Sequence, residues 1–113
     1  MDNRFRGLKA EGVEYFSHKN YEGVVITWSG NRGKKLKDKE VYEFGEYTLL
    51  YDKESKSYSG DSEKMDYDSK EFLQYLLNQI EIKEDSIEKG IQFLIKMRDN
   101  FDKVKVNNWT KRS

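Results

Sequence analysis

The chain has 113 residues, no net formal charge, 35% hydrophobic residues and 14% aromatic residues. This length suits a single domain, 1–113, and buried aromatic rings can supply its core because each removes roughly 150–250 Å² from water. The absence of cysteine excludes disulfides, thiolate metal sites and cysteine nucleophiles. The first ten residues lack the apolar segment of a secretory signal, and no apolar run reaches the roughly 18 residues of a membrane span, so we expect a cytoplasmic domain.

The first half of the chain, residues 11–60, has the alternation of β-strands. Val24, Ile26 and Trp28 share one phase of a β-branched stretch, and residues 13–15 indicate an earlier strand. The polar stretch between these two strands predicts a turn, and the glycine-bracketed stretch that follows Trp28 predicts a loop.

A second extended segment is predicted over residues 40–52. Five of its aromatic and aliphatic residues fall into two phases: Tyr42 and Phe44 in one, and Tyr47, Leu49 and Tyr51 in the other. A β-bulge or a tight turn at Gly45 would bring all five onto one face. Residues 56–59 are expected to return as a short hairpin strand, and connections this short favour antiparallel pairing.

The hydrophobic period changes to 3.6 residues after residue 68 and predicts two helices, at 69–81 and 86–105. Asp68 with Glu71, and Asp85 with Glu88, have the spacing of a capping box at the two helix starts. The short connection predicts that the helices pack as a hairpin. Residues 107–113 are expected to form a flexible tail.

Gly90 interrupts the apolar stripe of the second helix, where glycine costs up to about 1 kcal/mol relative to alanine. Close approach to another backbone would explain it. Taken together, the pattern predicts an α+β fold: a small antiparallel sheet of 3–5 strands, followed by a C-terminal helical hairpin that packs on one face.

Charge is unevenly distributed along the chain. Residues 1–39 hold nine Lys/Arg against five Asp/Glu, residues 40–88 hold five against fourteen, and residues 89–113 hold seven against two. The basic ends either neutralise the acidic middle within the fold or form separate patches that steer a charged partner.

The basic run at residues 32–39 is the strongest candidate site, because aromatic residues lie on both sides of it. The residues expected to contact a partner are Trp28, Arg32, Lys34, Lys35, Lys37, Tyr42, Phe44, Tyr47 and, in the C-terminal tail, Trp109. Lysines beside stackable rings suit single-stranded nucleic acid, but the acidic middle of the chain would repel a polyanion. Tyrosine and tryptophan also favour protein interfaces, and an open sheet face would present them.

No motif specifies catalysis, a metal ion or a cofactor. His18 lies in a polar turn, and the carboxylates of residues 61–68 do not have the spacing of an EF-hand loop. A metal-dependent enzyme therefore ranks third, and we expect no catalytic, metal or cofactor site.

The expected function is a non-enzymatic protein-binding domain that acts by covering a partner's surface, with a homodimer as one possibility. In composition, the chain is similar to small phage and mobile-element accessory proteins, which include inhibitors of host defence and immunity-type proteins. The alternative is a single-stranded nucleic-acid-binding protein that uses the 32–39 loop. No membrane partner is expected.

Overall fold

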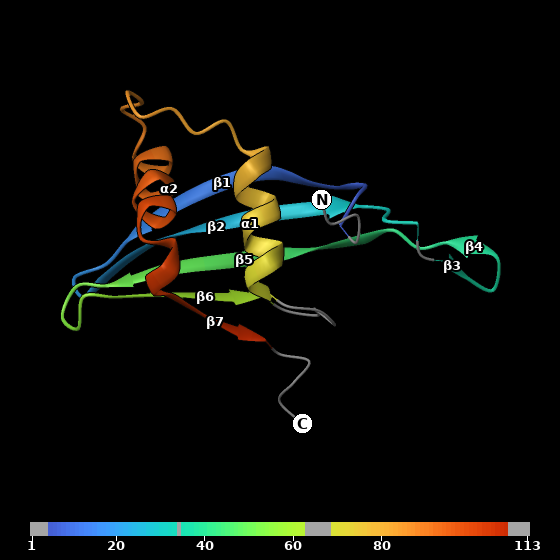
Figure 1. Ribbon diagram of the computed structural model, residues 1–113, viewed down its shortest axis with the longest axis horizontal. Coiled ribbons are helices and arrows are strands. Elements are labelled where there is room, and N and C mark those ends of the chain that lie inside the picture. The colour runs from blue at the N-terminus through green and yellow to red at the C-terminus, as the bar shows by residue number, and fades with distance from the viewer. Residues whose placement is uncertain (1–4, 34, 63–68, 109–113) are drawn as a thin grey trace.

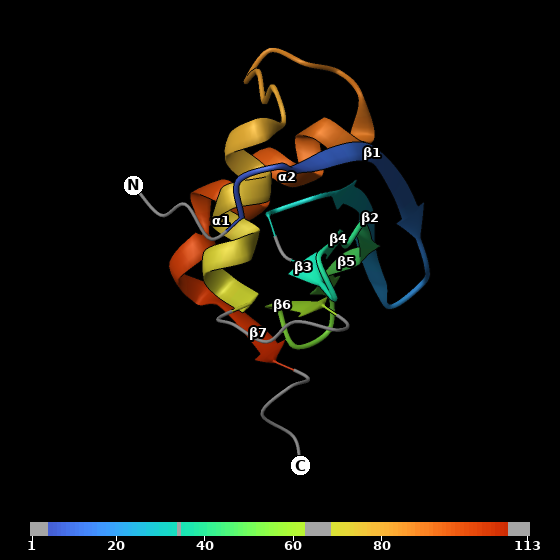
Figure 2. The ribbon, with the colours of Figure 1, turned by 90° about the vertical axis from the view of Figure 1, so that its right-hand side faces the viewer.

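The computed structural model describes residues 5–33, 35–62 and 69–108. The strands form a five-stranded sheet, ordered β1-β2-β5-β6-β7, and a separate two-stranded sheet, β3-β4. Two α-helices lie on one side of the five-stranded sheet (Figures 1 and 2). The prediction of an α+β fold is confirmed. Within the described residues, no helix is long and apolar enough to cross a membrane.

Four of the strands form antiparallel ladders in the order of a meander. They are β1 (Leu8–Ser17), β2 (Tyr21–Gly30), β5 (Glu43–Asp52) and β6 (Ser57–Ser62). Short turns join β1 to β2 and β5 to β6, so the predicted antiparallel pairing of this part of the chain is correct. The longer connection between β2 and β5 carries the small sheet.

The fifth strand, β7 (Val104–Asn108), pairs parallel to β6, with Tyr58 opposite Val104. The sheet is therefore mixed, and the prediction of an all-antiparallel sheet is wrong at this edge. The two helices lie between β6 and β7 in the sequence and provide the crossover that parallel pairing requires. The apolar pattern that suggested a helix as far as residue 105 includes Val104 because this residue is buried as part of a strand.

The helices are shorter than predicted: α1 spans Ser69–Gln79, α2 spans Lys89–Asp99, and the 3-10 turn η1 (Phe101–Lys103) leads into β7. Glu88 precedes α2 without a side-chain capping bond, so the predicted start of this helix at a capping box is wrong. Asp68 lies outside the described residues. Each helix packs mainly on the sheet, and the predicted packing of the two helices as a hairpin is not confirmed.

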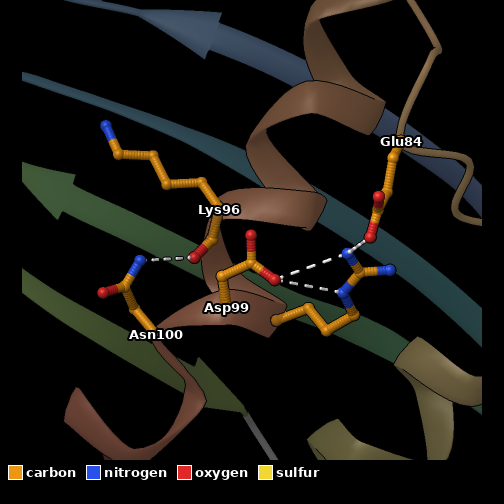
Figure 3. Close-up of polar contacts among 5 residues, drawn as sticks. Glu84, Lys96, Asp99 and Asn100 are labelled. Atoms are coloured by element: carbon orange, nitrogen blue, oxygen red, sulfur yellow. Dashed lines mark hydrogen bonds and ion pairs between the residues drawn. The ribbon is translucent and has the colours of Figure 1, made fainter.

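The C-terminal end of α2 is held by polar contacts (Figure 3). The Asn100 side chain donates to the carbonyl oxygen of Lys96 over 2.9 Å. Arg98 donates to Glu84 over 2.9 Å and so connects the helix to the segment that precedes it. The Lys96 carbonyl also accepts the Asn100 backbone N–H over 3.1 Å, so the Asn100 side chain adds a second donor at this helix end.

The core lies between the helices and one face of the main sheet. Strands β2 and β5 contribute Val24, Ile26, Trp28, Tyr47 and Leu49, and the helices contribute Phe72, Leu73, Leu76, Leu94 and Met97. The pairing of β2 with β5 is unbroken from Tyr21 to Gly30, so no bulge occurs at Gly45, contrary to the prediction. The register shift lies in β1 instead, between Ala10 and Gly12.

Strand β1 forms one edge of the main sheet, and α1 protects part of it. The amide of Gln79 accepts a hydrogen bond from the Ala10 N–H over 2.7 Å and donates one to the Leu8 carbonyl over 2.7 Å. The Tyr75 hydroxyl also donates to the Leu8 carbonyl, over 2.9 Å. The Gln79 side chain thus takes the place of a neighbouring strand, which limits edge-to-edge pairing at this point.

Candidate functional site

The connection between β2 and β5 forms a hairpin arm, defined here as residues 31–42. Within it, β3 (Lys35–Leu36) pairs antiparallel with β4 (Lys39–Glu40). Lys37 and Asp38 both have positive φ angles, 52° and 63°, which is the geometry of a two-residue hairpin turn. The arm extends beyond the end of the main sheet along the long axis of the molecule (Figure 1).

The base of the arm is fixed by an ion pair and a hydrogen-bonded chain of side chains. Nε of Arg32 lies 2.7 Å from Oε1 of Glu43, and both side chains are largely buried. The Ser29 hydroxyl donates to the carboxylate of Glu11 and lies 3.2 Å from the Tyr42 hydroxyl. These contacts connect the base of the arm to β1, β2 and β5, so its orientation relative to the sheet is defined.

Three large apolar side chains are exposed on or beside the arm. Leu36, Tyr42 and Phe44 are each 67% exposed. Phe44 also borders two shallow hollows: one of about 200 Å³ with Trp28, Tyr42 and Glu43, and one of about 340 Å³ on the opposite face to the helices. Exposed aromatic side chains such as Tyr42 and Phe44, which border one hollow together, are typical of protein interaction sites.

The charges around the arm are of both signs. Lys35, Lys37 and Lys39 are exposed towards its tip, and none forms an ion pair with another described residue. The larger hollow near its base is bordered by the carboxylates of Glu11 and Glu46. A nucleic acid that followed the lysines towards the sheet would meet these carboxylates, which is unfavourable.

The structure separates the residues that were predicted to contact a partner into three groups. Lys35, Lys37, Tyr42 and Phe44 are exposed on or beside the arm, and Arg32 is held at its base by Glu43. Trp28 and Tyr47 are buried, so they support the site from within the core and do not form its surface. Lys34 and Trp109 lie outside the described residues.

Sequence reasoning missed Leu36 and the network of Glu11 and Ser29. Leu36 is the one apolar residue within the basic run. Its isolation among charged residues was the signal that could have identified it as a site residue. The contact between Glu11 and Ser29 joins two paired strands across 18 positions of the chain, and the sequence pattern does not reveal this pairing.

A second polar cluster lies on the helix side of the sheet. The Tyr15 hydroxyl donates to Oε2 of Glu22 over 2.7 Å, and Nζ of Lys96 lies 3.3 Å from Oε1 of Glu22. The hydrogen bond from Tyr15 lowers the pKa of Glu22, with a further contribution from Lys96, although partial burial opposes the shift. The same hydrogen bond raises the pKa of Tyr15.

Lys96 also lies over the ring of Tyr51, with Nζ 3.9 Å from the ring centroid. A hollow of about 320 Å³ beside the cluster is lined by Tyr15, Glu22, Phe93 and Lys96, together with residues of the first turn of α2. The paired groups connect α2 to β1, β2 and β5, so the cluster orients the helix on the sheet.

The remaining candidates have structural explanations or lie outside the described residues. The ring of His18 stacks on Tyr21 at 4.6 Å in the turn between β1 and β2. In the ranges that the structure describes, no group of three His, Asp or Glu side chains could hold a metal ion. Most of the acidic segment at 61–68 lies outside those ranges.

No protein-family model, curated protein or solved structure matches this chain.

Proposed function

We propose that this chain is a non-enzymatic protein-binding domain and that the hairpin arm, together with Tyr42 and Phe44 at its base, is the binding surface. The observation that carries this proposal is that Leu36 and Tyr42 on the arm, and Phe44 beside its base, are each 67% exposed. Within the described residues, the other large apolar side chains that are exposed are Tyr21 and Ile87.

The shape of the arm supports binding by coverage of a partner's surface. A hairpin that extends beyond the sheet can enter a concave surface that the body of the domain cannot reach. Its turn and its anchored base reduce the conformational entropy that is lost on binding. This mode of action agrees with the inhibitor or immunity-type role that the composition suggested, and that role is part of the proposal.

The experiment is affinity capture from cells that naturally contain this chain, with tagged wild-type protein and two variants. The arm variant carries Leu36→Ser, Tyr42→Ser and Phe44→Ser. The control variant carries Ile87→Ser, which removes a residue that is 89% exposed but distant in sequence from the arm. We expect a specific protein to be captured by the wild type and the control and to be lost by the arm variant.

Capture that is equal for all three proteins would overturn the proposal. A separate titration with a fluorescent single-stranded oligonucleotide tests the nucleic-acid alternative. Binding that weakens steeply with salt, and that is lost when Lys35, Lys37 and Lys39 are changed to Glu, would favour that alternative. We expect no such binding, because the carboxylates of Glu11 and Glu46 border the hollow near the base of the arm and would repel phosphates.

A further inference from the structure

The face of the main sheet that points away from the helices, called the open face here, is acidic. Strand register places both acidic and basic side chains on the open face. The acidic residues are Glu11, Glu14, Glu46, Asp52 and Asp61, and the basic residues are Lys9 and Lys105. Glu14 and Glu46 are exposed, and neither forms an ion pair with another described residue.

The open face also carries apolar side chains at the end that is remote from the arm. Phe16 lies over the backbone of Gly23, where an added Cβ would be 2.6 Å from its ring, and it contacts Tyr21 edge to face. Leu50 lies opposite Gly23 in the register and is half-buried. An apolar area of this kind with carboxylates around it is complementary to a surface that combines apolar side chains with lysines.

The arm is such a surface, because Leu36 lies opposite Lys39 at its tip, next to Lys35 and Lys37. The arm cannot meet the open face of its own chain, since it extends beyond the end of the main sheet (Figure 1). Contact between the two complementary surfaces therefore requires a second molecule.

We propose that the partner of the arm is a second copy of this chain, with the arm of each copy lying across the acidic open face of the other. This inference rests on the proposed function, because it names the partner of the same arm. A two-fold axis makes the contact reciprocal, so the assembly closes as a dimer.

The first test is sedimentation velocity of the wild-type chain over a range of protein and salt concentrations. We expect a monomer–dimer equilibrium that shifts to dimer as protein concentration rises and to monomer as salt rises, because opposite charges contribute to the contact. A wild-type chain that stays monomeric at every concentration would overturn the inference.

The decisive test uses charge reversal. One variant reverses the arm, with Lys35→Glu, Lys37→Glu and Lys39→Glu, and the other reverses the open face, with Glu14→Lys and Glu46→Lys. Each variant alone brings like charges together, and we expect its dimerisation to weaken by roughly tenfold or more. An equal mixture restores opposite charges at both contacts and should form a heterodimer of near wild-type affinity.

All these substitutions are at exposed positions, and circular dichroism verifies that each variant is folded. If the mixture contains only monomers, the inference fails. If the wild type is monomeric and captures a foreign protein that the triple variant at Leu36, Tyr42 and Phe44 does not capture, the inference fails and the proposed function stands. If no arm-dependent interaction of either kind is observed, both fail.

Discussion

At the scale of single residues, Glu22 shows how a charge can be placed beside the core of a small domain. Its carboxylate receives the Tyr15 hydroxyl at 2.7 Å and faces Lys96 at 3.3 Å. A charge beside a hydrophobic core is unfavourable unless it is paired and hydrogen-bonded. Both conditions are met here by residues from three different elements, β1, β2 and α2, so the cluster depends on the complete fold.

The lowered pKa of Glu22 leads to a prediction about acid stability. As the pH falls, Glu22 of the unfolded chain binds a proton before Glu22 of the folded chain does. The contribution of Glu22 to the free energy of unfolding is therefore complete above its ordinary pKa, and it is lost as the pH falls through the lowered pKa of the folded state. We expect the urea midpoint of the wild type to fall between about pH 5 and about pH 3 by more than that of Glu22→Gln. Urea titrations of both proteins across this interval measure the difference.

Tyr15→Phe is the matched control for this prediction, because it removes the hydrogen bond that contributes most to the lowered pKa of Glu22. Its acid-induced loss of stability should lie between those of the wild type and Glu22→Gln. Identical pH dependence in all three proteins would show that Glu22 has no stabilising interaction in the folded state.

At the scale of elements, the glycine in α2 has a different explanation from the one that its position suggested. Gly90 is buried where α2 passes over β1, and an added Cβ would be 3.5 Å from Val13 and 3.8 Å from Tyr15. These are ordinary contact distances to side chains, and no other backbone lies close enough to require glycine.

We therefore expect Gly90→Ala to stabilise the protein by roughly 0.5–1 kcal/mol, because alanine has the higher helix propensity and the added methyl group fits. Gly45→Ala is the contrasting variant, since its Cβ would be 2.7 Å from the buried ring of Trp28, and we expect it to destabilise by about 1–3 kcal/mol. Denaturant unfolding of both variants measures the two effects. Shifts of the same sign would contradict the packing described here.

The elements that were predictable from the sequence are those with a local pattern. The alternation of Val24, Ile26 and Trp28 correctly indicated β2, and the 3.6-residue period indicated α1 and the central part of α2. Strand β7 was missed because its pairing with β6 is parallel and connects distant residues, and because Val104 continues the helical spacing of the preceding stripe. A residue such as Val104, which fits the period of a helix and that of a strand, can be assigned to one of them only from its tertiary partners.

The site was predictable in part for the same reason. Composition indicated the basic run and the nearby aromatics, but it could not show that Phe44 is exposed while Tyr47 is buried. These two residues lie on opposite faces of β5 because its register with β2 is unbroken at Gly45. A single assumed bulge was enough to place both on one surface, since a shift of one residue reverses the face of every side chain that follows.

At the scale of the whole molecule, the core and the proposed binding surface lie in different parts of the chain. The core lies between the helices and the main sheet, whereas the tip of the arm, residues 35–40, is exposed throughout. Main-sheet pairing of β2 with β5 ends at Gly30 and Glu43, before the arm begins. Residues at the tip of the arm can therefore change without altering the packing of the core.

The corresponding prediction concerns a variant in which residues 34–40 are replaced by Gly-Ser-Gly. We expect its free energy of unfolding to stay within about 1 kcal/mol of the wild type, because residues 35–40 are exposed and shortening a loop changes its closure entropy only slightly. Denaturant unfolding followed by circular dichroism measures this. The ion pair of Arg32 with Glu43 is retained in the variant and keeps the ends of the shortened loop together.

The same variant should lose both arm-dependent capture and self-association, because it lacks Leu36 and the three exposed lysines. Stability that is retained while binding is lost would identify the arm as an element selected for recognition. A large fall in stability or a loss of cooperative unfolding would instead show that the arm contributes to the fold, and the division between core and binding surface would then be wrong. The two measurements on one variant therefore decide between a recognition role and a structural role for the arm.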